Sequence, residues 1–259
     1  MGSEERKRSF LGLIIIIIMQ LAIPTIVARV WYAKTKCSQK PLRLGIIGYL
    51  CSFIIQKFLI FIVKLFANSK GITAYAFETA LPGIFEEIAR YICFYFFIFK
   101  KSKKKNTSVD YGIGHGGMVS IVDAFYFSYK FFFSKDKDRV LSLCLLNVVE
   151  KTSKFFYNIS LSVMVYKSLR DGNLLYFFLA IIFHMIIDFF DLMGEEENIN
   201  NYAVAIIMLA ITLASVGFAY YLYMNMKDPI DENVDNKSSE KIEKINDTDD
   251  GKKLEEGKS

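Results

Sequence analysis

Six ionisable side chains lie inside otherwise apolar stretches of the sequence, and their types could support hydrolytic chemistry. They are Glu86, Glu87 and Arg90 in one stretch, His115 in a second, and His184 and Asp188 in a third. A charge at the centre of a bilayer costs about 2.5–3.5 kcal/mol on insertion scales, so such residues are usually there for a function. His115 and His184 are also the two histidines of the chain. The set predicts one intramembrane site.

Spacing along the chain indicates that these groups can meet. Glu86 and Arg90 are four residues apart, as are His184 and Asp188, so each pair shares one face of a helix. Four glycines surround His115 and would let a neighbouring helix approach closely: Gly112, Gly114, Gly116 and Gly117. Counted from the basic loops, Glu86 lies roughly 14 residues deep and each histidine roughly 10, or ~15–20 Å at ~1.5 Å per residue. All three therefore lie at nearly one depth.

Peptide hydrolysis is the chemistry that this set could perform. A carboxylate can act as general base on water, and two imidazoles can hold a metal or stabilise a developing oxyanion. We expect Glu86 to be base or ligand, Glu87 its partner, and His115 and His184 ligands or oxyanion stabilisers. Two histidines and a carboxylate also form a zinc-type ligand set with an open position for water, so zinc is the cofactor to expect.

Two further residues are expected to support these four. Asp188 would orient His184 or act as a further metal ligand. Arg90 would neutralise and orient a glutamate. Each group also has a purely structural explanation: a buried ion pair for Arg90, an interhelical hydrogen bond for His115, and an intrahelical pair for His184 with Asp188. Their shared depth favours a common site.

The surrounding sequence predicts an all-α, polytopic integral membrane protein. Hydrophobic residues make up 53% of the 259 residues, and the stretch 10–28 carries no ionisable side chain. About seven stretches could cross a ~30 Å hydrocarbon core as helices, which satisfy their backbone hydrogen bonds internally. They are residues 10–32, 44–67, 73–99, 108–133, 153–168, 173–193 and 202–226. Basic residues at 6–8 and 135–139 leave an eighth span or a re-entrant segment open.

Charge divides the chain into two regions and orients it. Residues 1–226 form the predicted transmembrane helical domain, and the charged segment 227–259 is predicted to be a disordered cytoplasmic tail. Basic loops at 33–43, 100–105 and 167–170 fall on one side, which places the N-terminus outside and the C-terminus in the cytoplasm, with the cell membrane as the expected location.

The net charge of +5 reflects Lys and Arg at span ends, so nucleic acid is not expected as a partner. The expected partners are the lipid bilayer and a membrane-associated peptide or protein substrate.

The site residues resemble the motifs of a superfamily of intramembrane proteases that includes the CAAX prenyl endopeptidases and bacteriocin-processing or immunity proteins. Its members show Glu-Glu followed by Arg, then Phe-x-x-x-His, then His-x-x-x-Asn/Asp, each on a separate membrane helix. The matching residues here, in that order, are Glu86, Glu87 and Arg90; Tyr111 (Tyr in place of Phe) and His115; and His184 and Asp188. The Gly-x-Gly-His-Gly-Gly form of the second motif is most similar to the YhfC branch of intramembrane metalloproteases. The resemblance covers about residues 70–193 and implies an intramembrane endopeptidase.

Two positions depart from the pattern of that branch. The branch places Glu four residues after the glycine-flanked His, where this chain has Val119, and His in the fifth span, where this chain has Asn158. Tyr111 and Asn158 are expected to support the site. The departures favour an alternative in which a catalytically silent member binds peptide or acts as an immunity or scaffold protein.

A proton-coupled transporter that uses the His and Glu groups as a relay is a further alternative. The absence of inverted repeats weakens it. In the preferred interpretation, the helices enclose a polar cavity that opens toward the cytoplasmic half of the membrane.

Overall fold

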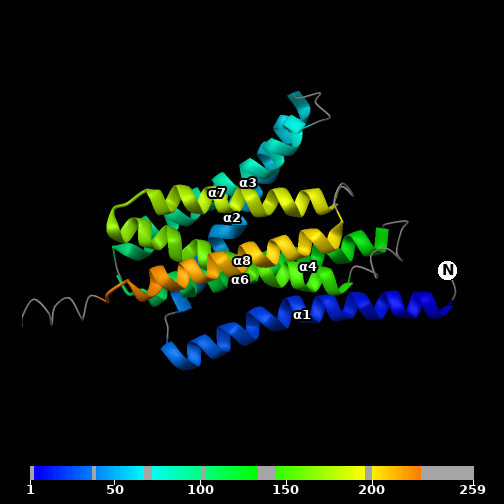
Figure 1. Cartoon of the computed structure of the whole chain (residues 1–259), viewed down its shortest axis with the longest axis horizontal. Helices are drawn as coiled ribbons and strands as arrows, with labels where there is room; N and C mark the ends of the chain where they lie inside the picture. The colour runs from blue at the N-terminus through cyan, green and yellow to red at the C-terminus, as the bar shows by residue number, and fades with distance from the viewer. Residues whose placement is uncertain are drawn as a thin grey trace, which may run out of the picture.

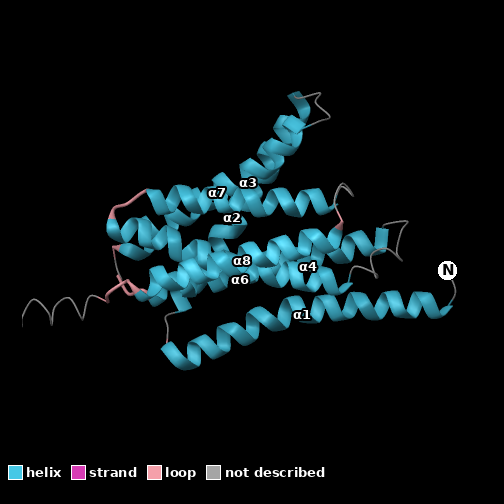
Figure 2. Ribbon diagram, viewed as in Figure 1, coloured by secondary structure: helices cyan, strands magenta, loops and turns pink. Residues whose placement is uncertain are grey.

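The computed structural model describes residues 3–36, 39–66, 72–100, 103–133, 144–195 and 200–228, and these form helices joined by loops (Figure 1, Figure 2). The elements are α1 (Ser3–Thr35), α2 (Gln39–Phe66), α3 (Ile72–Ile92), the π-helix η1 (Cys93–Phe99), α4 (Asn106–Phe133), α6 (Cys144–Asp171), α7 (Leu175–Glu195) and α8 (Asn201–Met224). No strand occurs in these residues, which confirms the all-α prediction. Each predicted apolar stretch corresponds to one α-helix, and η1 continues α3. The basic stretch 135–139 and nearly all of the predicted tail, 227–259, lie outside the described residues.

Four of the described helices are long and apolar enough to cross a membrane. These candidate spans are Phe10–Thr35, Gln39–Val63, Leu175–Met193 and Asn201–Met224. The other long helices, α3, α4 and α6, carry most of the polar residues of the predicted site, which lower their hydropathy. The helical fold is therefore confirmed with four candidate spans, whereas the count of seven spans stays a prediction.

The helices pack around α4 and α6. Helix α4 lies between α2 and α6, α6 also contacts α8, and α3 lies against α7. Figure 1 shows α1 along one side of this group, and the end of α2 and the start of α3 projecting away from it. The site residues of α3, α4 and α7 therefore come from neighbouring parts of one bundle.

The loops that carry the basic residues meet at one end of the bundle. The Lys105 amide donates to Asp228 Oδ1 at 2.9 Å, and the Arg170 guanidinium donates to the carbonyl of Lys103 at 3.4 Å. The Trp31 indole, near the end of α1, donates to Asp110 Oδ1 in α4 at 2.7 Å. We call this end of the bundle, where α1, η1, α6 and α8 finish and α4 begins, the basic-loop end. That it faces the cytoplasm stays a prediction.

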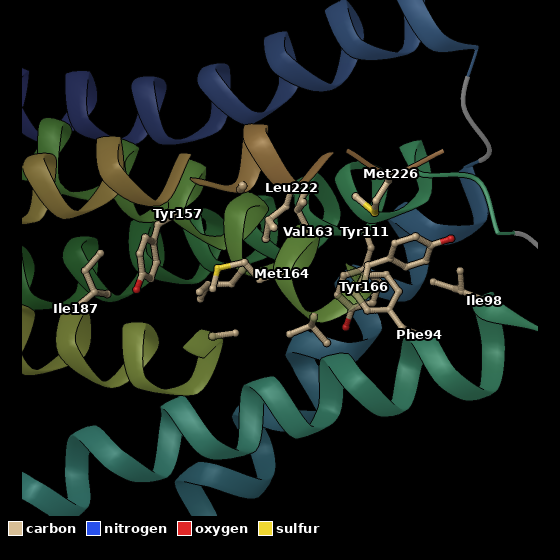
Figure 3. Close-up of a cluster of buried hydrophobic side chains, with 14 of the residues drawn as sticks. Phe94, Ile98, Tyr111, Tyr157, Val163, Met164, Tyr166, Ile187, Leu222 and Met226 are labelled. Atoms are coloured by element: carbon tan, nitrogen blue, oxygen red, sulfur yellow. The ribbon is translucent and has the colours of Figure 1, made fainter. Parts of the chain in front are cut away.

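An apolar and aromatic cluster runs along the bundle, from Met208 in α8 and Tyr157 in α6 toward the basic-loop end (Figure 3). The Phe94 ring lies 4.6 Å from that of Tyr111 and 5.3 Å from that of Tyr166, measured between centroids. Ile98 extends the cluster further in the same direction. Burial of such side chains stabilises the packing of α4 and α6 against η1 and α8.

The glycines around His115 provide the close contacts that the sequence predicts. An added Cβ at Gly114 would collide with the backbone of Leu42 in α2. At Gly112 it would lie 2.7 Å from Cα of Ile159 in α6, and at Gly116 it would lie 2.9 Å from the carbonyl oxygen of Phe155. Helix α4 thus touches the backbones of both neighbours, which confirms the predicted close approach.

Replacing Gly114 by Ala is expected to lower the melting temperature of the protein in detergent. The added methyl group must separate α2 from α4, and such overpacking costs roughly 1–3 kcal/mol. The matched control is Gly217→Ala in α8, where an added Cβ meets nothing within 4 Å. Because Ala is the better helix former by about 1 kcal/mol, the control should keep or raise the melting temperature. Equal melting temperatures would contradict the close contact.

Candidate active site

Glu86, His115 and His184 converge from three helices. His115 Nε2 on α4 lies 3.2 Å from Glu86 Oε2 on α3. His184 Nε2 on α7 lies 3.6 Å from the same oxygen. All three side chains are buried. The structure therefore brings together the three groups that the sequence places at one depth, and both imidazoles face one carboxylate oxygen.

Glu87 orients His184 through the other ring nitrogen. Its Oε1 lies 2.7 Å from His184 Nδ1, so Nδ1–H donates to Glu87 and Nε2 faces Glu86. Such a carboxylate contact fixes both the tautomer and the orientation of the ring. Asp188 lies at the opposite nitrogen, with its Oδ2 3.5 Å from His184 Nε2.

Arg90 pairs with Glu87, which differs from the partner that its spacing indicates. The four-residue spacing favours Glu86, but Arg90 Nη1 lies 2.5 Å from both carboxylate oxygens of Glu87, one turn earlier at i−3. Arg90 Nη2 also donates to Asn158 Oδ1 on α6 at 2.9 Å. Both residues of the ion pair are fully buried. Helix rotation decides the choice, because the face of α3 that carries Glu87 and Arg90 points toward α6 and α7.

Tyr111 and Asn158, which are expected to support the site, each contact one of its residues. Tyr111 stacks on His115, with ring centroids 5.9 Å apart and planes 29° from parallel. Tyr49 on α2 contacts the same imidazole edge-on at 5.3 Å. Asn158 accepts from Arg90 and donates to the carbonyl of Lys154 at 3.0 Å. Val119 is buried and brings no polar group to the site.

Gln56 is a site residue that sequence reasoning missed. Its Nε2 donates to Glu86 Oε1 at 3.2 Å, so both oxygens of Glu86 have contacts. The neighbouring Lys57 is exposed instead and lies over the Phe53 ring. The signal was available, because Gln56 is the one side-chain amide in the apolar stretch 44–67.

A second group of ionisable side chains adjoins the site, and we call it the charged cluster. It consists of Asp123 on α4, Glu150, Lys151 and Lys154 on α6, and Asp188 and Asp191 on α7. Lys154 Nζ lies 3.1 Å from both Asp188 Oδ1 and Asp191 Oδ2, and Lys151 Nζ lies 3.1 Å from Asp191 Oδ1. Sequence reasoning missed Lys151, Lys154 and Asp191. The three-residue spacing of 151 to 154 and of 188 to 191 could have revealed them.

Cation pairing leaves Glu86 as the available carboxylate of the site. Arg90 neutralises Glu87, and Lys154 neutralises Asp188. Within the described residues, Glu86 contacts histidines and an amide but pairs with no Lys or Arg. Glu86 is therefore the carboxylate of the site that no Lys or Arg holds, which makes it the candidate for a general base.

The placement of these groups does not form a finished metal site. Among the side chains that the structure describes, no three His, Cys, Asp or Glu residues are arranged to hold a metal ion. Both imidazoles contact the Glu86 carboxylate directly instead. Zinc therefore stays a prediction from residue types, and we derive no chemical step through it.

The sequence matches the model of a known protein family. The family model described as YhfC intramembrane metalloprotease matches residues 19–124 and 137–209, which is more than half of the chain. The match covers every residue of the site and of the charged cluster. No curated protein and no solved structure matches the sequence.

Proposed function

The chain belongs to the YhfC intramembrane metalloprotease family, and from this premise we propose that it is an intramembrane endopeptidase that cleaves a membrane-associated peptide or protein. The observation that carries the proposal is the meeting of His115 and His184 at one oxygen of Glu86, inside a helical membrane protein. A base and two polar hydrogen-bonding rings at one point are the groups that amide hydrolysis requires.

In this proposal Glu86 is the general base. It accepts a proton from water as the water oxygen attacks the scissile carbonyl, and it returns the proton to the leaving amine. Gln56 holds the other oxygen of Glu86 and so fixes the carboxylate plane. His115 and His184 stabilise the negative charge that develops on the carbonyl oxygen, and burial strengthens that interaction.

Glu87 and Arg90 position the site without reacting. Glu87 holds His184 at Nδ1, and Arg90 neutralises the charge that Glu87 brings into the bundle. We also propose that the basic-loop end faces the cytoplasm, because Lys and Arg are retained on that side during insertion.

Cleavage of transmembrane peptides by the purified protein in lipid vesicles tests the proposal. We expect cleavage by the wild-type chain, loss of cleavage in His115→Ala, and unchanged cleavage in Lys57→Met. Lys57 is the matched control because it is also ionisable and lies in an apolar helix, but is exposed and away from the site. A parallel reaction in chelator, with zinc added back, decides whether zinc takes part.

Absence of cleavage by well-folded wild-type protein would contradict the proposal. Peptide binding without cleavage would then favour the catalytically silent member of the family. Proton-coupled uptake into the vesicles would favour the transporter.

A further inference from the structure

The charged cluster lies on the side of the site that is away from the basic-loop end. His115 is about nine residues into α4 from that end, or ~14 Å, whereas Asp123 is about 17 residues in, or ~25 Å, at ~1.5 Å per residue. Asp191 on α7 and Lys151 on α6 are at comparable distances from the same end. With a hydrocarbon core of ~30 Å, the cluster therefore extends from the middle of the membrane toward its far face.

Exposure rises in the same direction. The side chains of Glu87 and His115 are 0% exposed and that of Glu86 is 9% exposed, whereas Asp188 is 12% and Asp123 is 22% exposed. The lysines and Asp191 have values between those of Asp188 and Asp123. An ionised group that faced lipid would cost about 2.5–3.5 kcal/mol, so the exposed parts of the paired lysines and aspartates favour contact with water over contact with lipid.

The opposite direction is closed by apolar packing. Between the site and the basic-loop end lie Phe94, Tyr111, Met164 and Tyr166, each with no exposed surface (Figure 3). The packing runs against the expectation of a cavity that opens toward the basic, predicted cytoplasmic half.

We propose that the charged cluster is the route by which water and the polar part of a substrate reach Glu86, from the membrane face opposite the basic loops. Asp188 joins the two regions, since one of its oxygens faces His184 and the other pairs with Lys154. The route favours substrates whose hydrophilic segment emerges at that far face. The direction of access is independent of whether the site hydrolyses peptides.

Thiol labelling from each side of the membrane tests the route. In full-length protein with its four cysteines replaced, single cysteines are introduced at Asp123 in the cluster and at Lys103 as a marker of the basic-loop end. Two control positions lie on α4. Ser108→Cys replaces a buried residue near the basic-loop end. Phe125→Cys replaces an apolar residue that is 73% exposed. A charged, membrane-impermeant maleimide is then applied to vesicles of each orientation.

We expect Asp123→Cys to react only from the face opposite the one that labels Lys103→Cys. It should react at least about tenfold faster than Phe125→Cys, because a thiolate forms in water and not in lipid. Labelling from the same face as Lys103→Cys would overturn the proposal, as would reactivity no higher than that of Phe125→Cys. Glu150→Cys provides a second cluster position if Asp123→Cys does not fold.

Discussion

Glu86→Gln is expected to lower the rate of peptide cleavage by roughly 10²–10⁴-fold, the range that general acid–base groups contribute. Gln keeps the size of the side chain and can still contact Gln56 and the two imidazoles, but its amide cannot accept a proton from water. The fold should survive, because the change removes a buried charge that has no Lys or Arg partner among the described residues. Cleavage kinetics and the melting temperature, measured on the same preparation, separate a loss of catalysis from a loss of stability.

Asp171→Asn provides the control for Glu86→Gln. Asp171 is a carboxylate that pairs with a lysine one turn away at the basic-loop end, and it lies outside the site. It should leave cleavage unchanged. Cleavage by Glu86→Gln at the wild-type rate would show that Glu86 is not the general base, even though the chain belongs to a protease family.

Arg90→Met is expected to cause the largest loss of stability, about 3–5 kcal/mol, which is typical when one partner of a buried ion pair is removed. The Glu87 carboxylate would keep only His184 as a partner, and Asn158 Oδ1 would lose its donor. We expect a lower melting temperature in detergent and reduced yield of folded protein.

The double variant Glu87→Gln/Arg90→Met isolates the charge effect. Removing both charges together should recover a large part of the lost stability, because no uncompensated carboxylate remains in the bundle. If the double variant were as unstable as Arg90→Met, the contribution of Arg90 would lie in its packing and not in its charge.

Much of the fold follows from the sequence because helical periodicity and hydropathy are local properties. Every predicted apolar stretch corresponds to one helix, and the glycines around His115 make the close contacts expected of them. The meeting of Glu86, His115 and His184 was also predictable, since rise per residue fixes the depth of a side chain along a helix axis.

Which side chains pair with one another was not predictable in the same way. Depth says nothing about rotation of a helix about its axis, or about which helices are neighbours. Arg90 therefore pairs with Glu87 where the spacing favoured Glu86, and Gln56 reaches the site while the adjacent Lys57 points outward. The lysines of α6 form ion pairs with the aspartates of α7 because the two helices pack together.

The sequence by itself thus determined that the chain is helical, that several of its helices are apolar enough for a membrane, and at what level its polar groups lie. The tertiary structure alone decided which groups touch, which carboxylate is left without a cation, and on which side of the site the remaining charges gather. The physical reason is that rise along a helix is fixed by backbone hydrogen bonds, whereas rotation and neighbours are fixed by side-chain packing over the whole bundle.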